Sequence, residues 1–217
     1  LVGFTACDSF LDEDPKSSLT LDTYYKTSAD IIGNVNYLYR DGAPDKMGNM
    51  TGAYRGSSLS VMNMVTGYFV NEYEGQEVDC SYARQLTRQD FTQSCCNYLT
   101  NDTWKSCYKS INVANAVIKY VDGVEMDNQA QYKAEARFFR ALNYFYLVKM
   151  FGDVPMVTEP TEDATLVEYP TRTAASEVFN TVIIPDLQFA VENLPNATFA
   201  GNSHRVTKYA ADMLLAD

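Results

Sequence analysis

Hydrophobic and polar positions follow a helical rhythm most clearly between Gln131 and Pro155. Apolar side chains recur there every three or four residues, which is the spacing of one face of an α-helix. The residues of this face are Ala134, Phe138, Ala141, Phe145 and Val148, widened by Phe139, Leu142 and Tyr146. Gly152 suits a left-handed C-cap, and Pro155 prevents the helix from continuing. A helix with so wide an apolar face must lie between other helices, so we expect it at the centre of an all-α domain.

A second helix is predicted from Asn101 to Val121, with Asn101 or Asp102 as its N-cap and a stop at Gly123. Its larger apolar residues are Trp104, Tyr108, Ile111, Ala114, Ile118 and Val121. A turn at residues 126–128 joins it to the central helix. Two helices of this length joined by a few residues form an antiparallel pair, the unit of tetratricopeptide-type repeats of roughly 34 residues. We therefore expect tetratricopeptide-like helical repeats.

Three further helical patterns flank this pair. They lie at Thr20–Tyr39, at 173–194 and at His204–Asp217. Thr20 and Thr173 are the expected N-caps of the first two. Pro185 falls inside the second pattern and predicts a kink or break, because proline lacks the amide hydrogen that a helix needs. The prolines and acids between residues 156 and 173 predict an extended segment over the surface.

From Gly42 to Leu99 the helical periodicity is lost, and glycine and tyrosine are interleaved with amides and hydroxyls. A long insertion of this kind is usually functional or disordered, and its many tyrosines argue against disorder. Tyrosine rings can stack on sugar rings, while amide and guanidinium groups can bond sugar hydroxyls. The candidate ligand-binding residues are Tyr68, Asn71, Tyr82 and Arg84. The simpler alternative for each is that it covers the helices, and we interpret Trp104 as a core residue.

Charge and cysteine spacing narrow the classes of function. The 217 residues include 28 acids and 17 bases, and the net charge of −11 argues against nucleic-acid binding because phosphates select basic surfaces. No nucleotide-binding or metalloprotease motif occurs, and the cysteine spacing does not match a zinc site, so we expect neither cofactor nor metal. For Cys80, Cys95, Cys96 and Cys107 we prefer buried thiols to a disulfide, whose connectivity the sequence does not determine.

Acid–base catalysis finds little support in the sequence. His204 is the only histidine, and a capping or solvated role at a helix start suits it better than catalysis. Glu135 is interpreted as an ion-pair partner of Arg137 and Arg140 on its own helix. A carboxylate pair for glycoside hydrolysis stays an alternative among the 28 acids, although nothing separates any pair from surface charge. We therefore predict that the protein is not an enzyme.

The first seven residues end in Thr5-Ala6-Cys7 after a short apolar run. This resembles the end of a secretory signal at a bacterial lipobox, in which the cysteine is lipidated, although Phe4 replaces the more usual leucine. The alternative is a piece of a buried strand. We expect residues 1–6 to be a signal-peptide remnant, residues 7–19 a lipidated N-terminus and tether anchored through Cys7, and residues 20–217 a helical domain.

The run Ala134–Ala141 (AEARFFRA), followed by Tyr144-Phe145 and closed by residues 151–155 (FGDVP), is similar to the signature of the SusD/RagB family. Residues 8–15 resemble the family's "FLD–P" leader behind the lipidated cysteine. Residues 204–207 resemble the start of the family's next repeat helix, with His204 in place of a glycine.

This resemblance implies a surface-exposed, lipid-anchored protein of the outer membrane that captures oligosaccharides without cleaving them. It also implies delivery of these ligands to a SusC-like TonB-dependent transporter, and a chain that is the N-terminal portion of a longer family member, truncated at its C-terminal end. The alternatives are a peptide-binding lipoprotein of the RagB kind, a helical-repeat scaffold that binds only protein partners, and a lipid-anchored glycoside hydrolase.

Overall fold

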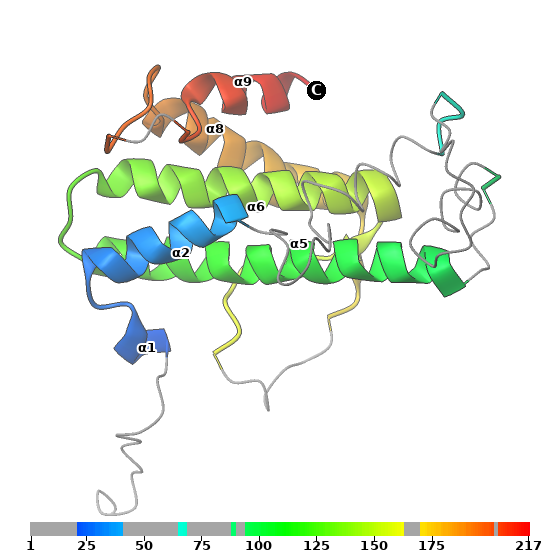
Figure 1. Ribbon diagram of the computed structural model, residues 1–217, viewed down its shortest axis with the longest axis horizontal. Coiled ribbons are helices and arrows are strands. Elements are labelled where there is room, and N and C mark those ends of the chain that lie inside the picture. Colours follow the sequence, from blue (N-terminus) through cyan, green and yellow to red (C-terminus); the bar gives the residue numbers. More distant parts are fainter. Residues whose placement is uncertain (1–20, 41–64, 69–87, 90–93, 163–169, 202–203) are drawn as a thin grey trace, which may run out of the picture.

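The computed structural model describes residues 21–40, 65–68, 88–89, 94–162, 170–201 and 204–217. Its elements are α1 (Leu21–Tyr24), α2 (Ser28–Arg40), α5 (Ser94–Tyr120), the 3-10 helix η2 (Val121–Gly123), α6 (Gln129–Phe151), β1 (Val154–Pro155), β2 (Arg172–Thr173), α7 (Ala175–Val178), the π-helical η4 (Phe179–Ile183), α8 (Ile184–Asn193) and α9 (Lys208–Ala216). Figure 1 shows α5 and α6 side by side, with α2 across them and α8 and α9 beyond α6. The predicted all-α class is confirmed.

Helix α6 lies at the centre of the helices, as predicted. It packs against α2, α5, α7 and α8, and 13 of its 23 residues are buried. The buried positions occur on every side of the helix, since the consecutive residues 134–136 and 138–141 are all covered. Gly152 follows the helix with φ 69° and ψ −124°. This positive φ is tolerated by glycine because it has no Cβ.

The antiparallel pair of α5 and α6 is also confirmed. Within the connection, Gln129 Nε2 donates hydrogen bonds to the carbonyls of Val121 and Val124 at 2.9 and 2.8 Å. The small residues Ala114, Ala134 and Ala141 are fully buried, which allows the helices to approach closely.

Two helix starts differ from those predicted. Helix α5 begins at Ser94 instead of Asn101, so Asn101 and Asp102 lie inside a helix that their capping propensity did not interrupt. The predicted helix from Thr20 is broken between α1 and α2, because Thr27 and Asp30 form a capping box that starts a new helix. The Thr27 amide donates to Asp30 Oδ2 at 2.8 Å, and the Asp30 amide donates to the Thr27 hydroxyl at 3.4 Å.

The segment after α6 is held against the helices. Residues 156–162 contain neither helix nor strand and four of them are exposed, as expected of the extended segment over the surface that was predicted from residue 156. Strands β1 and β2 pair antiparallel, and the hydroxyl of Tyr108 donates to the Pro155 carbonyl at 2.7 Å. The Tyr144 hydroxyl accepts a hydrogen bond from the Val157 amide at 2.7 Å and donates to the Val157 carbonyl at 2.9 Å. Side chains of α5 and α6 therefore satisfy this backbone in place of water.

The stretch from α7 to α8 runs through a π-helical turn. The N-cap of α7 is Ala174 instead of Thr173, and the carboxylate of Asp153 accepts a hydrogen bond from the Ala175 amide at 3.0 Å. Ahead of Pro185, the Ile184 amide donates to the Phe179 carbonyl five residues back. The proline lacks an amide hydrogen, and it is accommodated at the start of α8 behind this wider turn, so the expected irregularity is confirmed as a π turn.

Replacing Gly152 by alanine should lower the free energy of unfolding by about 1–3 kcal/mol, because an L-residue is strained at this positive φ. No atom lies within 4 Å of the added Cβ, so the loss reports backbone strain alone. Chemical denaturation measures it. Gly33→Ala, also in open space but inside α2, is the matched control and should stabilise by about 0.5–1 kcal/mol. Equal effects of the two changes would contradict the argument.

Candidate functional site

Glu135 is fully buried on α6, and its carboxylate is bound by residues from two distant parts of the chain. The Tyr39 hydroxyl donates to Oε1 at 2.5 Å, and Arg205 Nη1 donates to Oε2 at 2.5 Å. Arg205 Nη2 donates to Asn36 Oδ1 at 2.9 Å, and the Val206 amide donates to the Tyr39 hydroxyl at 2.9 Å. This network joins α2, α6 and the segment before α9. The predicted ion pair of Glu135 with arginines of its own helix is therefore wrong.

Arg140 forms a second buried ion pair, with Asp186 on α8. Its Nε and Nη2 donate to the two carboxylate oxygens at 2.6 and 2.9 Å, a bidentate arrangement. Arg140 Nη1 donates to Asn115 Oδ1 on α5 at 2.9 Å, and Arg137 Nη1 lies 3.6 Å from Asp186 Oδ1. Arg137 and Arg140 of α6 thus both contact the carboxylate of Asp186 on α8. Glu135 pairs with Arg205 instead.

Burial and pairing act on these carboxylates in opposite directions. Burial raises the pKa of Asp186 above its usual range and raises the pKa of Glu135 to about 7. Hydrogen bonds and the positive charges of Arg140 and Arg205 lower the same pKa values. Each carboxylate therefore depends on its arginine to remain ionised. Because both pairs are buried and each carboxylate is in direct contact with its arginine, we interpret them as framework.

Aromatic rings surround the guanidinium of Arg205. Its central carbon lies 4.8 Å from the ring centroid of Tyr132, 5.2 Å from that of Phe199 and 5.9 Å from that of Tyr39. Rings at these distances attract a cation through their electron-rich faces. Arg205 is thus held both by Glu135 and by this cage, so it is a fixed part of the core.

The described ranges hold little catalytic chemistry. No three side chains of His, Cys, Asp or Glu within them lie together in a way that could bind a metal ion. His204 is exposed, and the N-cap of α9 is Thr207, so His204 does not cap that helix. Trp104 packs against Tyr108 and Phe151, as expected of a core residue. None of the helices in these ranges has both the length and the hydropathy of a membrane span.

One predicted ligand-binding residue, Tyr68, lies within the described residues. It is 91% exposed and ends the turn 65–68, where Gly67 has φ 79°. The Tyr68 amide donates to the Thr66 hydroxyl at 3.2 Å, and Gln89 Nε2 donates to the Val65 carbonyl at 3.2 Å. The tyrosine ring is thus presented to solvent by a turn that has one internal hydrogen bond and a second one from Gln89.

Most of the other residues named from the sequence lie outside the described part of the chain. Asn71, Tyr82, Arg84, Cys7 and Cys80 lie outside the described residues, as do residues 1–19 with the proposed lipobox and tether. Cys95 and Cys96 belong to α5, and Cys107 is fully buried on the same helix.

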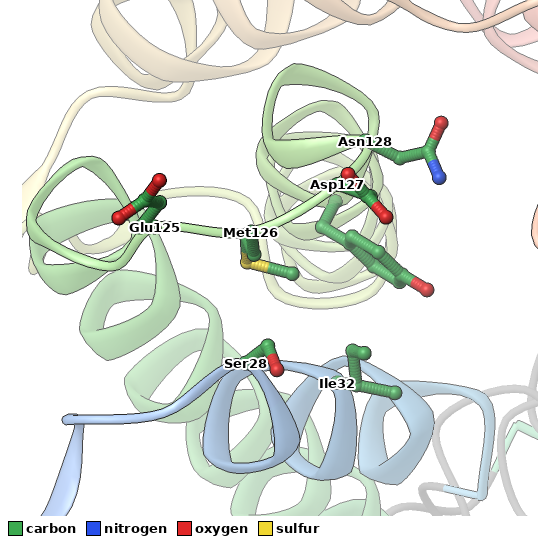
Figure 2. A pocket seen from close by; sticks show the side chains of 7 residues that line it. Ser28, Ile32, Glu125, Met126, Asp127 and Asn128 are labelled. Carbon is green, nitrogen blue, oxygen red and sulfur yellow. The ribbon is translucent and has the colours of Figure 1, made fainter.

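A pocket that sequence reasoning missed lies between the start of α2 and the connection from α5 to α6 (Figure 2). We call it the turn pocket; its volume is about 550 Å³, and its lining residues are Ser28, Ile32, Glu125, Met126, Asp127, Asn128 and Tyr132. In the view of Figure 2, the side chains of Ser28 and Ile32 on α2 lie opposite that of Met126 on the turn. The sequence signal was only a short acidic turn before a helix, and its pairing with α2 depends on tertiary structure.

Replacing Arg205 by methionine should leave Glu135 buried without its cation and cost about 3–5 kcal/mol of unfolding free energy near pH 8. The pKa of Glu135, already about 7, should then rise further. The folded state would bind a proton more tightly than the unfolded state, so the variant's stability should fall as pH rises from 5 to 8.

Denaturation of both proteins across this pH range measures the effect. The control is Glu135→Gln combined with Arg205→Met, which removes the titrating carboxylate and should lose the added pH dependence. A cost of Arg205→Met that is the same at pH 5 and pH 8 would show that Glu135 does not depend on Arg205 for its charge.

Comparisons with known proteins agree with this architecture. The family model described as "Starch-binding associating with outer membrane", a SusD-like family, matches residues 9–216. A SusD-like protein of Formosa agariphila, P25, is 27% identical over 222 residues, which cover 97% of this chain and 39% of that protein. This chain thus spans about two fifths of the length of that relative.

Two solved structures share the fold. A SusD-like carbohydrate-binding protein of Bacteroides fragilis superposes with a TM-score of 0.67 at 21% identity, over 89% of this chain and 37% of that one. A laminarin-binding SusD-like protein gives a TM-score of 0.66 at 23% identity, over 88% and 39%. The motif on α6, the helix pair and the match across nearly all of the sequence agree: the chain belongs to the SusD-like family.

Proposed function

We propose that this protein captures oligosaccharides at the surface of the outer membrane and delivers them to a SusC-like TonB-dependent transporter without cleaving them. The observation that carries the proposal is the match of residues 9–216 to a family described as starch-binding and associated with the outer membrane. Relatives of the same fold that are named for carbohydrate or laminarin binding support an oligosaccharide as the ligand.

Tyr68 is the residue in the described ranges best suited to touch a sugar. An aromatic ring binds a pyranose through its flat apolar face, which requires that face to be open to solvent. The 91% exposure of Tyr68 meets this requirement. We infer that Tyr68 stacks on the ligand, and that Asn71, Tyr82 and Arg84 of the same insertion bond its hydroxyls.

Lipidation of Cys7 would hold the protein at the membrane. Each buried methylene contributes about 0.8 kcal/mol to anchoring, and two acyl chains give stable attachment. Residues 8–19 would then act as a tether of mixed acidic and polar character. Capture and release would be the only steps required of the protein itself, since the transporter would supply the energy for uptake. Co-purification with the transporter from solubilised membranes tests this partner.

Replacing Tyr68 by alanine should weaken binding of an oligosaccharide about two- to tenfold, the range expected for the loss of one aromatic contact. Calorimetric titration with laminarin oligosaccharides and a panel of plant, host and microbial oligosaccharides measures it. Tyr68→Phe keeps the ring and should bind nearly as the unchanged protein does. Tyr209→Ala is the control, because Tyr209 is also exposed, at 56%, but lies on α9.

Unchanged affinity in Tyr68→Ala would remove Tyr68 from the site. A flat response to every sugar, with binding to peptides or to the transporter alone, would overturn oligosaccharide capture in favour of the peptide-binding or scaffold alternatives. Shortened products after hours of incubation would overturn the non-catalytic assignment.

Replacing Cys7 by alanine should abolish incorporation of a labelled fatty acid and move the protein from the membrane fraction to the soluble fraction. The measurement is metabolic labelling in a Bacteroidetes host, with Ser9→Ala as the control that leaves the thiol in place. Continued labelling of Cys7→Ala would contradict lipidation at this cysteine.

A further inference from the structure

Helix α9 carries apolar side chains on its outer face as well as on its inner face. On the inner face Ala211 is fully buried, and Leu214 packs against the core. On the outer face Tyr209 is 56% exposed, Met213 is 76% exposed and Ala216 is also exposed. These last three residues lie at positions i, i+4 and i+7, which form one stripe along a helix. We call them the α9 stripe.

The α9 stripe contrasts with the outer surface of the neighbouring helix. The exposed residues of α8 are Pro185, Gln188 and Glu192, a proline and two polar residues. Helix α9, by comparison, carries three of the five large hydrophobic side chains that are exposed within the described ranges. The last helix of a repeat stack needs a polar outer face to remain in water. Helix α9 does not have the surface of such a capping helix.

Both ends of α9 are fixed, so the stripe points in a defined direction. At the start of the helix, the Lys208 amide donates to the Pro195 carbonyl at 3.1 Å. At its end, Lys149 Nζ of α6 donates to Asp217 Oδ2 at 2.8 Å. Figure 1 shows α9 at the outer edge of the helices, with α8 between it and α6. Because the inner face is already packed, the helix cannot turn to bury the stripe against the core.

The geometry of the stripe suits another helix. The stripe runs about 10 Å along the axis, at 1.5 Å for each residue, and a helix covers such a row by placing its own side chains between those of the row. The small side chain of Ala216 allows a close approach of the two backbones. Consecutive long helices of this fold already pack in this way, α5 against α6, α6 against α8 and α8 against α9.

A second copy of the chain fits the stripe poorly. Asp212 lies beside the stripe, one residue before Met213. Two copies of α9 packed antiparallel through the stripe would bring two Asp212 carboxylates together near the centre of the contact, where like charges repel. The net charge of −11 on each chain adds to this repulsion.

A further helix of the same polypeptide fits better. This chain covers 39% of the Formosa agariphila relative P25 and 37% of the Bacteroides fragilis carbohydrate-binding protein, so proteins of this fold contain more polypeptide than these residues. Helix α9 ends at Ala216, next to the last residue of the sequence. A segment joined to that end would stay close to the stripe because the chain itself connects them.

We propose that the α9 stripe is covered by a further helix of the same polypeptide, which follows residue 217 in the full-length protein and packs antiparallel to α9. Apolar side chains three or four residues apart on that helix pack against Tyr209 and Met213, and its backbone lies closest to α9 at Ala216. The two helices form the next antiparallel pair, as α5 and α6 do. The proposal concerns packing within the protein and is independent of oligosaccharide capture.

The first test places the photoreactive residue p-benzoylphenylalanine at position 213 of the full-length gene product. Irradiation of the purified protein, followed by mass spectrometry, should give a crosslink within one chain to residues beyond 217. The yield should not change on dilution, because the contact is intramolecular. A crosslink to a second copy, a crosslink only to residues before 217, or no crosslink to protein would each overturn the proposal.

The second test measures how fast a maleimide modifies Met213→Cys in the same full-length protein, with mass spectrometry to separate this site from the native cysteines. In the native state the reaction should be at least about tenfold slower than that of Glu192→Cys, an exposed control on α8. In denaturant the two rates should be equal. Tyr209→Cys is a second variant of the stripe and should be protected in the same way. Equal native rates for the stripe and the control would show an open stripe and overturn the proposal.

Discussion

The burial of α6 on every side constrains the placement of the helices around it. A charged side chain taken out of water costs several kcal/mol unless an opposite charge compensates it. Glu135 and Arg140 both lie in this buried helix, and each finds its partner far along the chain: Arg205 is 70 residues from Glu135, and Asp186 is 46 residues from Arg140. The elements that carry these partners must therefore meet α6 in one register.

The signature residues Glu135, Arg140 and Tyr144 on α6 thus determine how the helices pack. Its carboxylate anchors α2 and the segment before α9, and its second arginine, Arg140, anchors α8 and contacts α5 through Asn115. The tyrosine that follows, Tyr144, satisfies the backbone at Val157. These groups are buried and occupied, so the motif identifies the family while leaving the choice of ligand to other residues.

Tyr68 and the turn pocket, which are both supported by these packed helices, differ in the chemistry of their side chains. Tyr68 offers an open aromatic face from a turn, which suits a sugar. The turn pocket is lined mainly by aliphatic, polar and acidic side chains. They belong to different parts of the sequence, so a change of ligand at the first need not alter the second.

The sequence alone determined the helical class, the central position of α6 and its pairing with α5, because apolar periodicity over twenty residues outweighs local variation. It also determined the glycine at the end of α6, since few other residues tolerate that backbone. The sequence predicted the helix starts less accurately. Thr27 and Asp30 begin a new helix inside a pattern that is continuous in the sequence, and Asn101 and Asp102, the predicted N-caps, lie inside α5.

Only the tertiary structure decided the partner of Glu135, since a nearby arginine on the same helix satisfies a sequence argument as well as a distant one. The tertiary structure also decided that α2 closes a pocket over the turn before α6. The residues that meet at this pocket are some 95 positions apart, and no local sequence pattern predicts their packing.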